Sequence, residues 1–201
     1  SNDSNFADYQ MAIFQDHKVF SDLTGSTVRV GVGVSSMLKL SEPVRRVRVG
    51  ILSGDFKRHD QINFVDGKDF LESDRGFYSN NDTDWGACGS EGTALASIIA
   101  ARSMDNGTFS GVSRSADLVA ARVSECGVVN RLALTDALVW MSGGNVNGVE
   151  NIKQSVDVIL IPYSVTSGDS CDPLLQQAID QAHKNNIVVI GITARSASSD
   201  K

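Results

Sequence analysis

The sequence has few cysteines and histidines, and their spacing does not suggest a metal site. Its three cysteines, Cys88, Cys126 and Cys171, show no C-x-x-C pattern, and the three histidines do not cluster with them. Zinc sites need such grouped ligands, so the pattern argues against a zinc-binding domain. The count fits one disulfide with one free thiol, and it equally fits three buried thiols in a reducing compartment.

The sequence also lacks long apolar runs and a strong excess of basic residues. No run of about eighteen apolar residues occurs, and we therefore expect no membrane span. The net charge is −6, and the one basic cluster is Arg45, Arg46 and Arg48. A small cluster beside a strand is typical of a solvated edge, so we expect no nucleic-acid partner. With 201 residues, the chain is long enough for one domain with a core.

Strand-like and helix-like segments alternate from residue 47 onward. Runs typical of strands occur at residues 47–53, 63–71, 116–123, 156–163 and 187–193. Segments with helical spacing occur at residues 92–102, 132–141 and 173–185. The last of these begins with Asp172 and Pro173, a favourable N-cap and first residue. The alternation predicts an α/β fold with a mostly parallel sheet and helices on both faces. Residues 1–40 are ambiguous, although residues 28–34 could form a strand.

An ordered set of motifs in this region resembles the subtilisin-like serine proteases, or subtilases. That family ends a strand with V-x-V-A-V-x-D-T/S-G and opens a helix with G-H-G-T-x-V-A-G-x-I-A-A. This chain has V-R-V-G-I-L-S-G at residues 47–54 and S-E-G-T-A-L-A-S-I-I-A-A at residues 90–101. The family then has a turn G-V-A-P-x-A-x-L and a strand ending K/R-V. Here G-V-S-R-S-A-D-L and A-R-V follow at residues 111–118 and 121–123.

Later motifs resemble one branch of the family, the secreted proteases of Gram-negative bacteria. They are R-V-S-E-C-G at 122–127, L-V-W-M-S-G at 138–143, S-G-D-S-C at 167–171 and I-V-V-I-G-I-T-A-R at 187–195. The resemblance implies one subtilase-like domain, with a core at residues 44–197 and an N-terminal extension or lead-in at residues 1–43. It implies a partial subtilisin-like fold that lacks the C-terminal part, and a secreted or periplasmic location.

The resemblance also implies that the catalytic positions are degenerate. Ser53 takes the place of the catalytic Asp, Glu91 that of the catalytic His, and Arg195 that of the oxyanion-hole Asn. The serine-protease triad needs an imidazole oriented by a carboxylate. A serine cannot stabilise an imidazolium, and a glutamate with an ordinary pKa of about 4.3 is a weak base at neutral pH. The nucleophile motif G-T-S-M-A does not occur in the sequence. We therefore expect an inactive relative, a pseudoprotease.

The substrate cleft is expected to differ as well. Subtilases bind a peptide along an S-L-G-G edge segment through main-chain hydrogen bonds. The matching edge here comprises Pro162, Tyr163 and Ser164, followed by Val165. Pro162 has no N–H to donate. Two interpretations follow: sequence drift after activity was lost, or a cleft reshaped for another ligand.

The resemblance supplies two further expectations. Cys126 and Cys171 match a bridged pair of the Gram-negative branch, so we predict that disulfide, which leaves Cys88 without an evident partner. Subtilases often bind calcium after the helix that carries the catalytic His. Asp105 and Asn106 occupy that place and offer the hard oxygen ligands that calcium prefers. No other cofactor is implied.

Three hypotheses about function follow. In the first, a non-catalytic subtilase-like protein binds a protein or peptide, which could be a protease, a protease inhibitor or a second copy of itself. In the second, the chain is the N-terminal fragment of a secreted serine endopeptidase. In the third, an unrelated hydrolase chemistry uses Ser53, Glu91 and Arg195, which we expect to converge in the remodelled cleft. Without a C-terminal half, the strand at residues 187–193 should expose apolar surface.

Overall fold

The computed structural model describes residues 45–72, 86, 88–102, 110–113, 115–164 and 172–192, together with the backbone of two short N-terminal strands. These strands, β1 (Lys18–Ser21) and β2 (Thr27–Val30), pair antiparallel. The strand predicted at residues 28–34 is thus present over residues 28–30.

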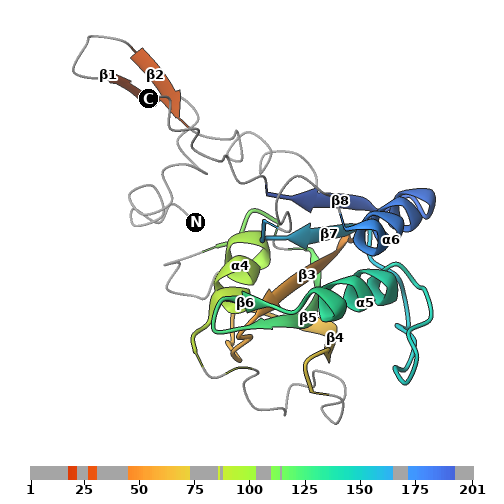
Figure 1. Cartoon of the computed structure of the whole chain (residues 1–201). Coiled ribbons are helices and arrows are strands. Elements are labelled where there is room, and N and C mark those ends of the chain that lie inside the picture. The colour runs from red at the N-terminus through yellow and green to blue at the C-terminus, as the bar shows by residue number, and fades with distance from the viewer. Residues whose placement is uncertain are drawn as a thin grey trace, which may run out of the picture.

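A parallel sheet forms the centre of the domain (Figure 1). Its strand order is β4-β5-β3-β7-β8, and each strand runs parallel to its neighbours. A short strand β6 (Val128–Val129) turns back antiparallel along the end of β5. The main strands are β3 (Arg48–Gly54), β4 (Phe64–Asp69), β5 (Asp117–Glu125), β7 (Val158–Ile161) and β8 (Val188–Gly191). The predicted mostly parallel sheet is confirmed.

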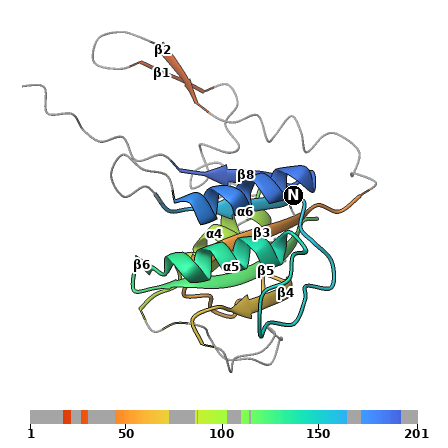
Figure 2. The same cartoon turned by 45° about the vertical axis from the view of Figure 1, so that its right-hand side comes forward.

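Helices lie on both faces of this sheet, as predicted. Figures 1 and 2 show α4 (Glu91–Ala100) on one face and α5 (Arg131–Met141) with α6 (Pro173–Lys184) on the other. The carboxylate of Asp172 accepts a hydrogen bond from the Leu174 amide at 3.0 Å, which confirms the predicted N-cap of α6. None of the described helices is long and apolar enough to cross a membrane.

Alternating strand residues divide the core into two layers. Ile51 of β3 belongs to the same buried cluster as Ala96 of α4, whereas the next residue, Leu52, belongs to the cluster that α5 and α6 cover. A strand points successive side chains to opposite faces, and both faces of β3 are covered. Hence β3 is apolar without interruption from Val49 to Leu52, which is the pattern of a central parallel strand.

Strand β8 lies at one edge of the sheet and pairs with β7. Val188, Ile190 and Ile192 share one face of this edge, with 56%, 49% and 53% of their surface exposed. Ile187 and Val189 instead pack in the core layer of α5 and α6. The apolar surface expected at residues 187–193 is therefore present over the described part of that segment.

Candidate functional site

The carboxyl ends of β3, β5 and β7 meet at one edge of the sheet, where α/β proteins commonly bind ligands. Ser53 lies at the end of β3 and Ser124 near the end of β5. The β3–β5 register shifts between Ser53 and Gly54, which brings Gly54 opposite Ser124. Tyr163 follows β7 by two residues, and Glu91 begins α4. Three strands and one helix thus contribute side chains to one place.

The phenol of Tyr163 connects these side chains. Its Oη atom lies 2.6 Å from Ser124 Oγ and 3.1 Å from Ser53 Oγ, and it donates to Glu91 Oε2 at 2.9 Å. The phenol has a single hydrogen, which the carboxylate receives, so both serines act as donors to Oη. We call Ser53, Glu91, Ser124 and Tyr163 the tyrosine hub. The hub brings together Ser53 and Glu91, the residues at the expected catalytic Asp and His positions.

The residues of the hub differ in their exposure to solvent. Ser53 and Ser124 are fully buried, Tyr163 is half-buried, and Glu91 is exposed. Burial raises the pKa of the Tyr163 phenol. Hydrogen bonds from the two serines lower this pKa in part, and the neighbouring carboxylate of Glu91 raises it. Tyr163 therefore stays protonated at neutral pH and serves as a hydrogen-bond donor, not as a base.

Glycines allow the elements of the hub to approach each other. A Cβ atom on Gly54 would lie 2.5 Å from the carbonyl oxygen and from Oγ of Ser124. A Cβ atom on Gly92, in the first turn of α4, would lie 2.8 Å from the carbonyl oxygen of Gly54. Both contacts are too short for a side chain. The start of α4 is therefore pressed directly onto the end of β3, which places Glu91 over the serines.

Asp55, immediately beyond β3, is strained and buried. Its φ angle is 53°, in the left-handed region that favours glycine, and the residue is almost fully buried. Its Oδ1 atom has no hydrogen-bond partner among the described residues. The carboxylate packs against Gly86, where a side chain would collide with it. Asp55 therefore lies beside the hub and is not one of its members.

The structure corrects the predicted disulfide. Cys126 is bonded to Cys88, with the Cα atoms 5.0 Å apart, so the predicted partner, Cys171, is wrong for this structure. Cys126 lies in the turn after β5, with a φ angle of 49°, and Cys88 lies just before α4. The loops at the carboxyl ends of neighbouring elements meet at this edge, which explains the pairing. Cys171 itself lies outside the described residues.

The remaining predicted site residues divide into two groups. On the cleft edge, Pro162 and Tyr163 are half-buried, and Ser164 is exposed. Arg195, Asp105 and Asn106 lie outside the described residues, so the oxyanion position and the calcium site stay predictions. Sequence reasoning missed Ser124, and nothing in its sequence context pointed to a role.

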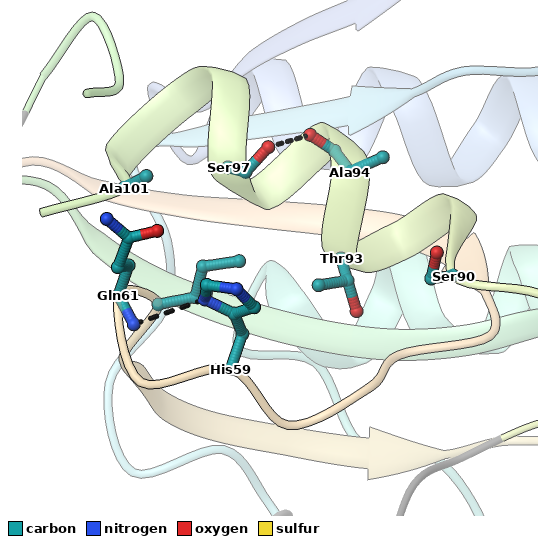
Figure 3. Close-up of a pocket in the computed structure, with 8 residues that line it drawn as sticks. His59, Gln61, Ser90, Thr93, Ala94, Ser97 and Ala101 are labelled. Atoms are coloured by element: carbon teal, nitrogen blue, oxygen red, sulfur yellow. Dashed lines mark hydrogen bonds between the residues drawn. The ribbon is translucent and has the colours of Figure 1, made fainter. Parts of the chain in front are cut away.

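A hollow of about 260 Å³ lies beside the hub, along α4 (Figure 3). Figure 3 shows the side chains of His59 and Gln61 on the loop that faces Ser97 of the helix and Ala101, which follows its end. His59 Nδ1 accepts a hydrogen bond from the Gln61 amide at 3.2 Å. This imidazole is thus engaged with its own loop, and the exposed residue of the hub is Glu91.

The chain is similar in sequence to a known protease. The chain is 31% identical over 109 residues to an extracellular protease of Xanthomonas campestris pv. campestris, a match that covers 54% of this chain and 18% of that protein. No protein-family model matches the chain.

Solved structures extend the likeness to most of the chain. A protease from Pseudoalteromonas arctica superposes with a TM-score of 0.57 and 26% identity, covering 72% of this chain and 48% of that one. The serine protease MycP1 of the type VII (ESX-1) secretion system gives a TM-score of 0.51 at 21% identity, covering 76% and 43%. The chain spans less than half the length of these relatives. It has the subtilisin-like serine protease fold and is a homologue of the subtilases.

Proposed function

We propose that this chain is a non-catalytic homologue of the subtilases that binds a protein or peptide partner instead of cleaving it. The tyrosine hub is the observation that carries the proposal. The position expected for the catalytic Asp holds Ser53, and the one expected for the catalytic His holds Glu91. Both side chains are engaged by Tyr163, at 3.1 and 2.9 Å.

The chemistry of the hub supports this proposal. Peptide hydrolysis by this family needs a base that takes a proton from the nucleophile and returns it to the leaving group. Tyr163 has a raised pKa and so is a poor proton acceptor, and the hydroxyl of Ser53 is fully buried. In a hydrolase that used Ser53 and Glu91, the hydroxyl of Ser53 would have to reach the substrate. Its burial disfavours that alternative.

The hub instead offers binding groups. The carboxylate of Glu91 is exposed at the carboxyl ends of the strands, beside the cleft edge of Pro162, Tyr163 and Ser164. A carboxylate accepts hydrogen bonds and attracts cations, so a peptide N–H or a basic side chain fits it. An exposed disulfide, Cys88–Cys126, supports an oxidising location outside the cytosol, where the Xanthomonas relative acts as an extracellular protease.

The test uses the complete gene product and a fluorophosphonate probe, with intact mass as the readout, alongside hydrolysis of casein and short peptides from acid to alkaline pH. An active subtilase serves as the positive control. We expect no adduct and no cleavage. A stoichiometric adduct on one serine would identify an active hydrolase and reject the proposal.

Binding is tested separately, with a peptide array probed by the same protein. We expect the Glu91→Gln variant to bind these peptides more weakly or not at all. The matched control is Glu150→Gln, another exposed glutamate that lies in the loop after α5. Equal binding by both variants would place the ligand elsewhere.

A further inference from the structure

We propose that the Cys88–Cys126 disulfide is a redox-sensitive clasp that holds the tyrosine hub closed. The proposal concerns the same site as the proposed function and rests on it for the consequence to ligand binding. The physical claim is narrower. Reduction of this one bond should loosen the first turn of α4 and release Glu91 from Tyr163.

The disulfide joins the two segments that carry the rim of the hub. Cys88 precedes Glu91 by three residues, and Cys126 follows Ser124 by two. Glu91 and Ser124 both contact Tyr163 Oη, at 2.9 and 2.6 Å. The covalent bond and these two hydrogen bonds therefore close a small ring of contacts. Opening the ring at the disulfide leaves the hydrogen bonds as the link between the two segments.

Helix α4 packs on the end of β3 at Gly92, but its first residues lack the capping contact that usually fixes a helix start. Its N-cap, Ser90, makes no side-chain capping hydrogen bond, so the first helical N–H groups lack the usual acceptor. Thr93 bonds the backbone of Lys57, with its Oγ1 donating to the carbonyl at 3.0 Å. Glu91 lies before that attachment, on the side of the disulfide. Reduction should therefore affect Glu91 more than the rest of the helix.

Both cysteines are exposed, so a reductant can reach the bond. Cys126 also lines an open hollow of about 540 Å³. The other residues that line it are Leu71, Glu125, Val128, Val129 and Asn130. Exposed disulfides are more readily reduced than buried structural ones.

The reduction needs a dithiol reductant. One of its thiolates attacks a sulfur of the pair and forms a mixed disulfide, and its second thiol then displaces the protein. The reductant ends as a disulfide, and Cys88 and Cys126 end as two thiols after gaining two electrons and two protons. No atom of the hub reacts. Glu91, already exposed, then has the carboxylate oxygen that Tyr163 occupied available for the N–H or cationic group of a ligand.

Hydrogen exchange of the whole chain tests the clasp. All samples carry Cys171→Ser, so that a single cysteine pair is present, and its redox state is verified by intact mass. On treatment with dithiothreitol, we expect the amides of Ala94 and Leu95, which form the first hydrogen bonds of the helix, to exchange about tenfold faster, while those of α6 are unchanged. The double variant Cys88→Ser with Cys126→Ser should reproduce this result without reductant.

Tyr163 provides the second readout. Its ring NMR signal, identified by its loss in Tyr163→Phe, should shift on reduction, and Glu91→Ala should remove most of that shift because the contact is already gone. Unchanged exchange at Ala94 and Leu95 would overturn the proposal. So would faster exchange throughout α4, α5 and α6, because the bond would then be a general staple. Neither readout depends on catalysis or on a partner, so the clasp can fail while the proposed function survives.

Discussion

The phenol oxygen of Tyr163 lies 2.6 Å from Oγ of Ser124, a contact that joins the segment after β7 to the end of β5 across the intervening β3. The hydroxyl of Ser53, on β3, makes a second hydrogen bond with the same phenol oxygen. Three strand ends are thereby linked through one atom. Because both serines are fully buried, the stability of this edge should depend on that atom.

Tyr163→Phe should destabilise the fold by about 1–3 kcal/mol, because it leaves two buried hydroxyls without their partner. Urea unfolding measures the change. The triple variant Tyr163→Phe, Ser53→Ala and Ser124→Ala removes the orphaned groups together and should be closer to the wild type. A triple variant that is less stable than the single one would contradict the hub as a unit.

Stability should fall at alkaline pH through Tyr163. Burial raises the pKa of this phenol in the folded chain above the ordinary value of about 10 that it has when unfolded. Its stabilising contribution is therefore complete below pH of about 10 and is lost as the pH rises from there through the folded pKa. Thermal unfolding followed from neutral to alkaline pH checks this. Tyr163→Phe should show a shallower alkaline decline, and an identical decline would exclude Tyr163 as the cause.

Asp69→Ala should be strongly destabilising. The Asp69 carboxylate accepts from Arg122 Nη1 at 2.9 Å, and both side chains are almost completely buried. Removing the carboxylate leaves a buried guanidinium with less compensation, at a cost of about 3–5 kcal/mol. Denaturant unfolding gives the value. The control is Arg46→Ala, which breaks the exposed pair with Asp117 and should cost about 1 kcal/mol or less. Equal losses would show that burial does not set the cost.

Asp55→Asn should stabilise the chain by about 1 kcal/mol. Asparagine keeps the shape, tolerates the left-handed conformation and replaces a buried carboxylate whose Oδ1 atom has no hydrogen-bond partner among the described residues. Asp60→Asn, at an exposed position nearby, should change stability by about 0.5 kcal/mol or less. Differential scanning calorimetry compares the two. A loss of stability in Asp55→Asn would mean that the carboxylate holds a partner that asparagine cannot replace.

The regular elements were predictable because their signals are local. Apolar strand runs and the Asp172–Pro173 helix start located β3 and α6 to within a residue or two. The position of β8 was not predictable in this way. An apolar run of this kind fits a central strand and an edge strand equally well. Only the assembled sheet shows that Val188 and Ile190 are half-exposed.

The site was predictable only in outline. The resemblance located Ser53 and Glu91 at one edge, but the link through Tyr163 depends on the reach of a side chain across three strands. The disulfide prediction carried a pairing over from the resemblance. It failed because Cys126 is bonded to Cys88, and the closeness of the segment before α4 to the turn after β5 cannot be deduced from sequence spacing.

The strand order also has a consequence for synthesis on the ribosome. Strand β3 pairs with β5 on one side and with β7 on the other, through residues 117–124 and 158–160. Neither partner exists when β3 emerges, and β7 is made more than a hundred residues later. Such non-local pairing slows folding. The apolar segment from Val49 to Leu52 therefore stays without its two partner strands until the ribosome has made β5 on one side and β7 on the other.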